Sequence, residues 1–218
     1  MNLIDDIKAV QRHYGLSPDG IAGPLFVGAV LADLRDRESI PRPPIPKETV
    51  IALGDGTIAN LDARTVKNIG TLDVKARDLF VSFALRCKAT AATYGCDYVM
   101  IEGDRTWEEQ DAIYAQGRTI KGKKVPGPKV TNAMGGQSNH NFRIAGDFGV
   151  FRGKVYLDDS DPELAAKVHK ACSMHAAACG LEWGGSWKSI LDLPHYEVFT
   201  GLSMMAKRAL FKKEGSVL

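Results

Sequence analysis

The sequence lacks several features that would point to particular classes of protein. Its 218 residues include four cysteines, and no two of them form a Cys-x-x-Cys pair. That spacing is typical of zinc ribbons and redox-active dithiols, so we expect these thiols to be small buried residues. Basic and acidic residues nearly balance, with a formal net charge of +2. Composition therefore gives no electrostatic reason to expect binding to nucleic acid.

Long apolar runs are also missing. The segment Met1–Asp6 is acidic and is not followed by an apolar core of signal-peptide length. No stretch approaches the roughly 20 apolar residues of a membrane span. With 44% hydrophobic and 25% charged residues, the composition is that of an ordinary globular protein. We expect synthesis in the cytoplasm, no stable membrane insertion, and a monomer.

Composition divides the chain into a short first unit, a linker and a long second part. Residues 1–40 predict two helices separated by the turn Ser17-Pro18-Asp19-Gly20. Four prolines within residues 41–46 predict an extended linker over residues 41–47. Residues 48–218 are long enough for one catalytic domain. Within them, the segment 50–69 carries no signal that we can assign to a function.

Hydrophobic spacing in the long second part predicts both helices and strands. A helix is expected over residues 73–94, where apolar residues recur at three- and four-residue steps. Residues 98–101 predict a buried strand, and residues 144–151 predict a strand with alternating faces. Further helices are predicted over residues 107–116, 162–180 and 202–211, the first two after the N-caps Thr106 and Asp161.

One stretch, Ser138–Asp147, gathers the residue types of a metal site. His140 precedes the predicted strand 144–151, and Asp147 lies on the face of that strand that carries only small neighbours. A second histidine, His195, follows further along the chain in similar company. Two imidazoles and one carboxylate are three ligands of the kind that a catalytic zinc ion takes, with the fourth position left for water.

These residues also carry a resemblance to a known family. Ser-x-His-(x)6-Asp, followed later by Asp-x-x-His, resembles the zinc peptidases of the VanY/VanX type. These are D-Ala-D-Ala carboxypeptidases and dipeptidases, together with the related phage L-alanyl-D-glutamate endopeptidases. The resemblance covers roughly residues 70–200 and includes Asp104-Arg105-Thr106 with Gln110 and the run Trp183-Gly184-Gly185-x-Trp187. The family usually has glycine at the position of Arg143.

The resemblance implies one zinc ion (Zn²⁺) held by His140, Asp147 and His195. It assigns the general base to Asp192, three residues before His195. The intervening proline favours one presentation of both side chains. Two other carboxylates compete for the role of base: Glu182 and Glu197.

Further positions of the family concern the substrate. Arg105 would stabilise the charge that develops on the attacked oxygen or hold a substrate carboxylate; the alternative is a surface ion pair with Glu102 or Glu109. The predicted substrate-binding residues are Ser138, Gln110 and Trp183. An exposed helical glutamine and a tryptophan that only packs are the alternatives for the last two.

Two segments outside the predicted metal site are candidates for contact with the cell wall. Residues 1–40, with the pattern Asp19-Gly20-x-x-Gly23-Pro24, resemble the helical peptidoglycan-binding module of many cell-wall hydrolases. A plain helical hairpin is the alternative. Residues 117–129 carry five basic and no acidic residues and predict a basic loop. It could contact an anionic wall polymer, cover the cleft, or simply be solvated.

The resemblance implies an α+β fold in which helices flank an antiparallel sheet, preceded by the small helical module. The expected function is that of a phage endolysin: a zinc endopeptidase that cuts the peptide stem of bacterial peptidoglycan at the L-Ala-D-Glu bond. Made in the host cytoplasm, it would act on the wall after release and lyse the cell. Three alternatives stay open: a D-Ala-D-Ala carboxypeptidase, a cytoplasmic dipeptidase, or a non-catalytic wall-binding protein whose zinc is structural, as the similar hedgehog-type signalling domains suggest.

Overall fold

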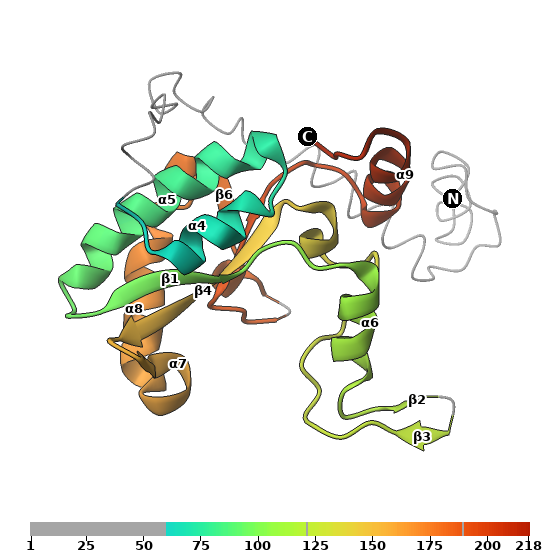
Figure 1. The fold of residues 1–218 in the computed structure, drawn as a ribbon, viewed down its shortest axis with the longest axis horizontal. Helices are drawn as coiled ribbons and strands as arrows, with labels where there is room; N and C mark the ends of the chain where they lie inside the picture. Colours follow the sequence, from blue (N-terminus) through green and yellow to red (C-terminus); the bar gives the residue numbers. More distant parts are fainter. Residues whose placement is uncertain (1–59, 121, 189) are drawn as a thin grey trace, which may run out of the picture. The chain divides into compact units, whose positions relative to one another are not determined.

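The computed structural model describes residues 60–120, 122–188 and 190–218 (Figure 1). The helical module predicted over residues 1–40, the linker over 41–47 and the first part of segment 50–69 lie outside the described residues. Within the described part, none of the helices combines the length and the apolar character that crossing a bilayer requires.

Six α-helices are present in the described part of the chain. They are α4 (Ala63–Gly70), α5 (Val74–Ala92), α6 (Trp107–Ala115), α7 (Leu157–Ser160), α8 (Pro162–Ser173) and α9 (Met204–Glu214). Side chains cap several of them as expected. Thr106 and Glu109 form a reciprocal capping box at the start of α6, and Asp161 caps α8, whose first residue is a proline.

The main sheet is antiparallel, with the strand order β1-β4-β7-β6. Its strands are β1 (Asp97–Glu102), β4 (Ala145–Arg152), β6 (Leu181–Trp183) and β7 (His195–Val198), and β5 (Val155–Tyr156) pairs with the end of β4. A separate hairpin joins β2 (Thr119–Ile120) to β3 (Lys123–Lys124). Short 3-10 turns cover Asn139–Phe142 (η2), Ala177–Cys179 (η3) and Gly184–Ser186 (η4). The predicted α+β class with an antiparallel sheet is confirmed.

One face of the sheet forms the core together with α5 and α8. Phe83 of α5 contacts the rings of Phe148 on β4 and Tyr196 on β7, at centroid distances of 5.3 and 4.3 Å. Because side chains alternate along a strand, the residues next to Phe148 and Tyr196 point to the opposite face. Those neighbours are Asp147 and His195, so the packing of the core directs two candidate ligands away from it.

Helix α4 covers the free edge of β1 (Figure 1). The Thr65 hydroxyl accepts a hydrogen bond from Met100 N at 2.9 Å, and Asn68 donates to Met100 O at 2.8 Å. Arg64 donates to Ile101 O at 3.2 Å. Side chains thus satisfy backbone groups that an edge strand otherwise exposes. Helix α4 lies within the segment 50–69, to which no function was assigned from the sequence.

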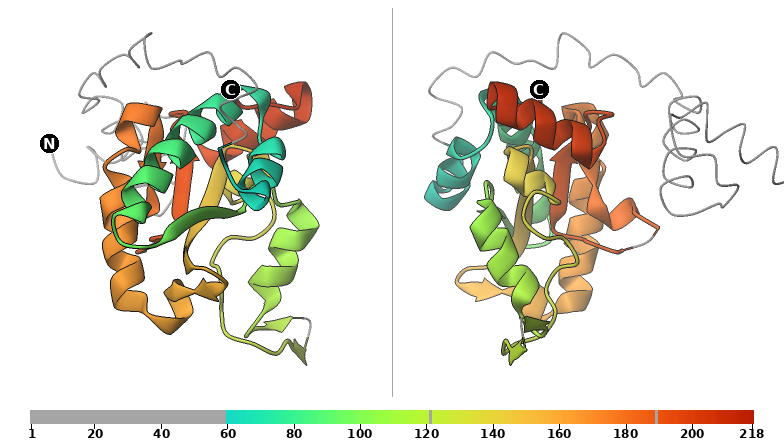
Figure 2. Two further views of the ribbon diagram at one scale, coloured as in Figure 1. Left: turned by 60° about the vertical axis from the view of Figure 1, so that its left-hand side comes forward. Right: turned by 90° about the vertical axis from the view of Figure 1, so that its right-hand side faces the viewer.

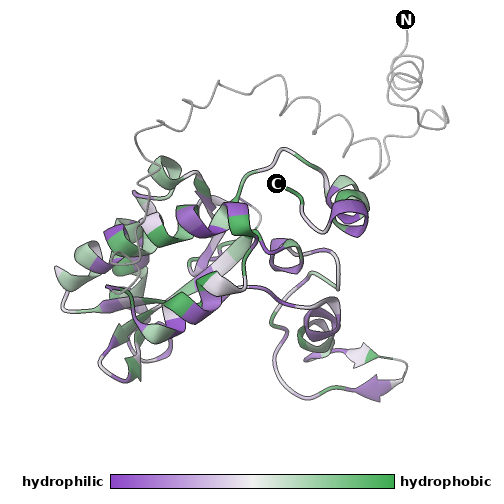
Figure 3. Cartoon of the chain, turned by 45° about the horizontal axis from the view of Figure 1, so that its top comes forward, coloured by the Kyte–Doolittle hydropathy of each residue, from purple (hydrophilic) through white to green (hydrophobic). Residues whose placement is uncertain are grey.

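Most predicted boundaries agree with the structure within a few residues, and two needed correction. The helix predicted over 162–180 ends at Ser173. Beyond it the chain forms tighter turns, in which the amides of His175 and Ala176 bond to carbonyls three residues back. The basic segment 117–129 is not only a loop, since it contains the β2–β3 hairpin. β3 consists of two exposed lysines and is hydrophilic in Figure 3.

Arg143 lies where the family usually has glycine, and its backbone explains that preference. Its φ of 60° makes it the one non-glycine residue with positive φ in the described part of the chain. It ends η2 in the left-handed conformation. The side chain is anchored on both sides, with Nε 3.5 Å from Asp104 Oδ2 and the guanidinium 5.6 Å from the centre of the Phe211 ring.

We expect Arg143→Gly to be more stable than Arg143→Ala. Both variants lose the contacts to Asp104 and Phe211, so the comparison isolates the backbone. A Cβ in the left-handed region costs about 1–2 kcal/mol, partly offset by the greater freedom of glycine in the unfolded chain. Denaturant unfolding should therefore give a difference of about 1 kcal/mol in favour of glycine. Equal stabilities would mean that this turn tolerates a side chain without strain.

Candidate metal centre

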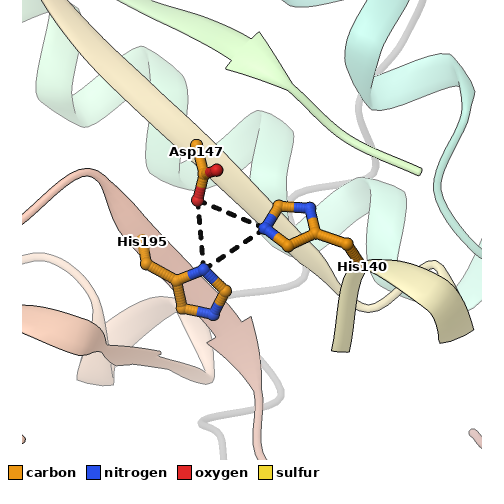
Figure 4. A group of neighbouring side chains, drawn as sticks. All are labelled: His140, Asp147 and His195. Carbon is orange, nitrogen blue, oxygen red and sulfur yellow. Dashed lines mark hydrogen bonds and ion pairs between the residues drawn. The ribbon is translucent and has the colours of Figure 1, made fainter. Parts of the chain in front are cut away.

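Three side chains that are distant in sequence meet on the polar face of the sheet (Figure 4). His140 comes from η2, Asp147 from β4 and His195 from β7, and the last two are directly opposite each other in the β4–β7 ladder. Asp147 Oδ1 lies 3.2 Å from His140 Nε2 and 3.0 Å from His195 Nδ1. The two ring nitrogens are 3.3 Å apart. The structure therefore brings all three predicted ligands together.

The spacing of these three atoms suits a tetrahedral ion. Zinc–nitrogen and zinc–oxygen bonds of about 2.0–2.1 Å place neighbouring ligand atoms about 3.3 Å apart. The observed separations of 3.0, 3.2 and 3.3 Å fall close to that value. The donor set of two imidazoles and one carboxylate is also the one zinc takes at catalytic sites. The residues present therefore fit a zinc ion.

Hydrogen bonds fix which nitrogen of each imidazole faces the centre. His140 Nδ1 donates to Gly103 O at 2.6 Å, which leaves Nε2 for a metal. His195 Nε2 donates to Glu197 Oε2 at 2.9 Å, which leaves Nδ1. Such outer partners set the tautomer and orientation of metal-binding histidines. Glu197, predicted as a competing base, thus supports a ligand.

The charges of the site suit a cation. Burial by itself would raise the pKa of Asp147, but His140 and His195 outweigh it and hold that pKa well below its usual value. Burial would lower the pKa of His195, whereas its hydrogen bonds to Asp147 and Glu197 raise it to about 10. A bound metal would take the place of a proton that these two acids favour on His195.

Gly184 allows the segment before β7 to approach the site. A Cβ at this position would lie 2.7 Å from Asp192 O and 3.0 Å from His195 Cβ. The Gly184 carbonyl also accepts a hydrogen bond from Asp192 N at 3.3 Å. Trp183 donates from its indole nitrogen to Leu193 O at 2.8 Å. The Trp-Gly-Gly run therefore positions the segment that carries Asp192 and His195.

A cavity of about 560 Å³ opens beside the three ligands. Asp192 and Ser138 both line it, as predicted for a base and a substrate-contacting residue. Burial raises the pKa of Asp192, and the negative charge of Asp147 adds to the effect. Trp187 lines the cavity and Trp183 does not, and substrate binding by Trp183 stays a prediction. The Trp187 ring lies 5.1 Å from that of His195.

Arg105 lines the same cavity while held in a bidentate ion pair. Its Nε donates to Glu102 Oε1 at 2.7 Å and its Nη2 lies 2.5 Å from Glu102 Oε2. Nη2 is also 3.9 Å from Asp147 Oδ2. The two sequence interpretations of Arg105 are thus compatible, because pairing with Glu102 leaves it at the site. Glu109 caps α6 instead.

Gln110 is fully buried, so the alternative of an exposed helical glutamine is wrong. Its Oε1 accepts from Arg105 Nη1 at 2.8 Å, and its Nε2 donates to Ala133 O at 2.8 Å. It does not line the cavity. Gln110 thus supports Arg105 and the cavity wall at Ala133, and its contact with substrate stays a prediction.

The other two histidines of the described residues, and the cysteines, belong to the packed interior or its margin. His169 bonds Tyr98 Oη at 2.8 Å and Asp158 Oδ1 at 2.6 Å, and His175 bonds Thr90 Oγ1 at 2.7 Å. Neither belongs to the metal-binding group, in agreement with the sequence. The four cysteines are buried and free. Glu182 does not line the cavity and lies opposite Glu197 in the β6–β7 ladder.

Three protein ligands beside an open cavity define a mononuclear metal centre of the catalytic type. Comparison with known families narrows this class. The model of a peptidase M15 family described as D-alanyl-D-alanine carboxypeptidase matches residues 131–198, which include all three ligands. Over these residues the chain is similar to the M15 peptidases.

Two known proteins are similar to the chain. Over 116 residues it is 40% identical to the peptidoglycan L-alanyl-D-glutamate endopeptidase CwlK of Bacillus subtilis (strain 168). That alignment covers 51% of this chain and 66% of CwlK, so the chain spans just under two thirds of this curated relative. The crystal structure of the L-Ala D-Glu endopeptidase ChiX of Serratia marcescens aligns with a TM-score of 0.42 and 22% identity, over 63% of this chain and 87% of ChiX.

We expect Gly184→Ala to weaken zinc binding at least about tenfold, because the new methyl group must displace the Asp192–His195 segment and outer-shell changes of this kind cost about 10–100-fold. Competition with a chromophoric chelator measures the affinity. Gly70→Ala is the matched control, since a Cβ there meets nothing within 4 Å. Unchanged zinc affinity in Gly184→Ala would mean that this close approach does not set the position of the ligand.

Proposed function

We propose that this protein is a zinc metallopeptidase that hydrolyses the peptide stem of bacterial peptidoglycan at the L-alanyl-D-glutamate bond. The observation that carries the proposal is the convergence of His140, Asp147 and His195 at tetrahedral spacing beside a cavity lined by Asp192 and Arg105. The choice of bond is supported by CwlK, whose name states this specificity.

A zinc ion held by the three ligands would polarise the scissile carbonyl and lower the pKa of a bound water to about 7. Asp192 accepts the proton of the attacking water as its hydroxyl adds to the carbonyl carbon. The same carboxyl group then passes that proton to the leaving amine as the carbon–nitrogen bond breaks. Arg105, held by Glu102 and Gln110, stabilises the negative charge on the attacked oxygen or binds a nearby carboxylate.

The biological role that we infer is lysis of a bacterial cell by a phage endolysin that reaches the wall after release from the cytoplasm. Its support is the resemblance of residues 70–200 to phage endopeptidases and of residues 1–40 to wall-binding modules. A D-Ala-D-Ala carboxypeptidase is the second candidate, because the matching family model is described by that activity.

Digestion of purified sacculi by zinc-loaded protein, with mass analysis of the fragments, tests the activity. We expect new alanine carboxyl ends and glutamate amino ends. Asp192→Asn should slow their appearance by about 10²–10⁴-fold, the range for loss of a general base, without abolishing zinc binding. The matched control is Asp159→Asn, an exposed acid on α7, which should digest like the wild type.

Other products would identify other functions. Release of single D-alanine would assign the carboxypeptidase activity. If zinc is bound and neither bond is cut, the protein is a binding protein with a structural metal. Equal rates for Asp192→Asn and the wild type would remove Asp192 from the role of base.

A further inference from the structure

Helix α9 carries a lysine that is buried beside the metal centre. Lys207 is 5% exposed, whereas Lys212 and Lys213 on the same helix are exposed. Lysine is seldom buried unless its charge is compensated, because removing an ammonium from water is costly. The sequence predicted a helix over residues 202–211 but not the burial of this lysine. Because Lys207 is buried, its charge interacts with groups inside the protein and not with solvent.

The partners of Lys207 belong to the wall of the cavity. Its Nζ donates to Asn139 Oδ1 at 2.7 Å. The carboxylates of Glu197 and Glu182 oppose the lowering of its pKa by burial. These two acids face each other across β6 and β7, so one ammonium compensates two neighbouring negative charges. Asn139 and Lys207 in turn help to lower the pKa of Glu197.

Glu197 and Asn139 are each adjacent to one of the candidate metal ligands. Glu197 accepts the hydrogen bond from His195 Nε2 at 2.9 Å. Asn139 immediately precedes His140 in η2. The ammonium of Lys207 therefore bonds the neighbour of His140 and acts through its charge on Glu197, the support of His195. The two histidines are 55 residues apart in the chain.

Other contacts show that α9 is fastened to the η2 region as a whole. Figure 2 shows α9 beside the gold η2 turn. The Phe211 ring lies 5.6 Å from that of Phe142, and Arg208 donates to Gly136 O at 3.0 Å. Lys207 is thus held on a helix that is packed against the metal centre from outside.

We propose that Lys207 is a positioning residue of the metal centre: its buried ammonium compensates Glu197 and Glu182 and fixes Asn139, so that His195 and His140 are presented at ligand spacing. The inference rests on the proposed function for the identity of the metal, but its test is metal binding and not peptidase activity. A failure to cut peptidoglycan would overturn the proposed function and leave this inference standing.

The test compares the zinc affinity of two variants of the full chain with that of the wild type, by competition with a chromophoric chelator. Lys207→Met keeps the length of the side chain and removes the charge. We expect it to bind zinc about 10–100-fold more weakly, the range for loss of outer-shell support. Lys212→Met, from the exposed face of the same helix, should match the wild type. Removal of a positive charge would by itself tighten zinc binding, so unchanged or tighter binding by Lys207→Met would overturn the proposal.

A second variant separates charge compensation from packing. Adding Glu182→Gln to Lys207→Met removes one of the two carboxylates that act on the ammonium, and we expect it to restore part of the lost affinity, as a double-mutant cycle would reveal. The imidazole N–H signal of His195 in the zinc-bound protein should shift in Lys207→Met and return toward the wild type in the double variant. No recovery would assign the loss to packing and overturn the proposal.

If Lys207→Met does not fold, the double variant is compared directly with the wild type. Failure of both to fold would give Lys207 a role in the fold and overturn its role at the metal.

Discussion

The pairing of β4 with β7 is the constraint on which the site depends. Asp147 and His195 are direct partners in this ladder, so the sheet itself sets the distance between a carboxylate and an imidazole. Phe148 and Tyr196, the next residues along, are fully buried on the other face. A slip of one residue would bury the ligands and expose the aromatic rings. The hydrophobic core therefore holds the register that the metal centre needs.

The groups that orient the two imidazoles beside that ladder are a backbone carbonyl and a carboxylate. Gly103 O and Glu197 orient the two imidazoles, and both supports depend on packing elsewhere. Gly103 lies against the end of α4, where a Cβ would meet Thr71 Oγ1 at 2.4 Å. Glu197 is hydrogen-bonded to Asn139 and is influenced by the positive charge of Lys207 on α9. The centre is thus rigid because elements on several sides each fix one of its ligands.

Sequence reasoning found the ligands because they follow local rules. Strand alternation placed Asp147 on a polar face, and the motif spacing singled out His140 and His195. It did not foresee that Gln110 is fully buried beside Arg105, or that the partly buried Trp183 bonds the Asp192–His195 segment. A helix period or a motif gives the residue type and its face, but whether that face meets solvent, a cavity or another element depends on chain segments far away.

The sequence by itself determined the α+β class, the caps of the helices, the candidate ligands and the resemblance to zinc peptidases, because these depend on short-range geometry and on residue chemistry at fixed spacing. Only the tertiary structure decided which atoms converge, which histidine nitrogen faces the centre, and that Trp187 lines the cavity. It also decided that Lys207 is buried. Burial and distance between remote segments are properties of the packed chain, since the same lysine in an isolated helix would be solvated.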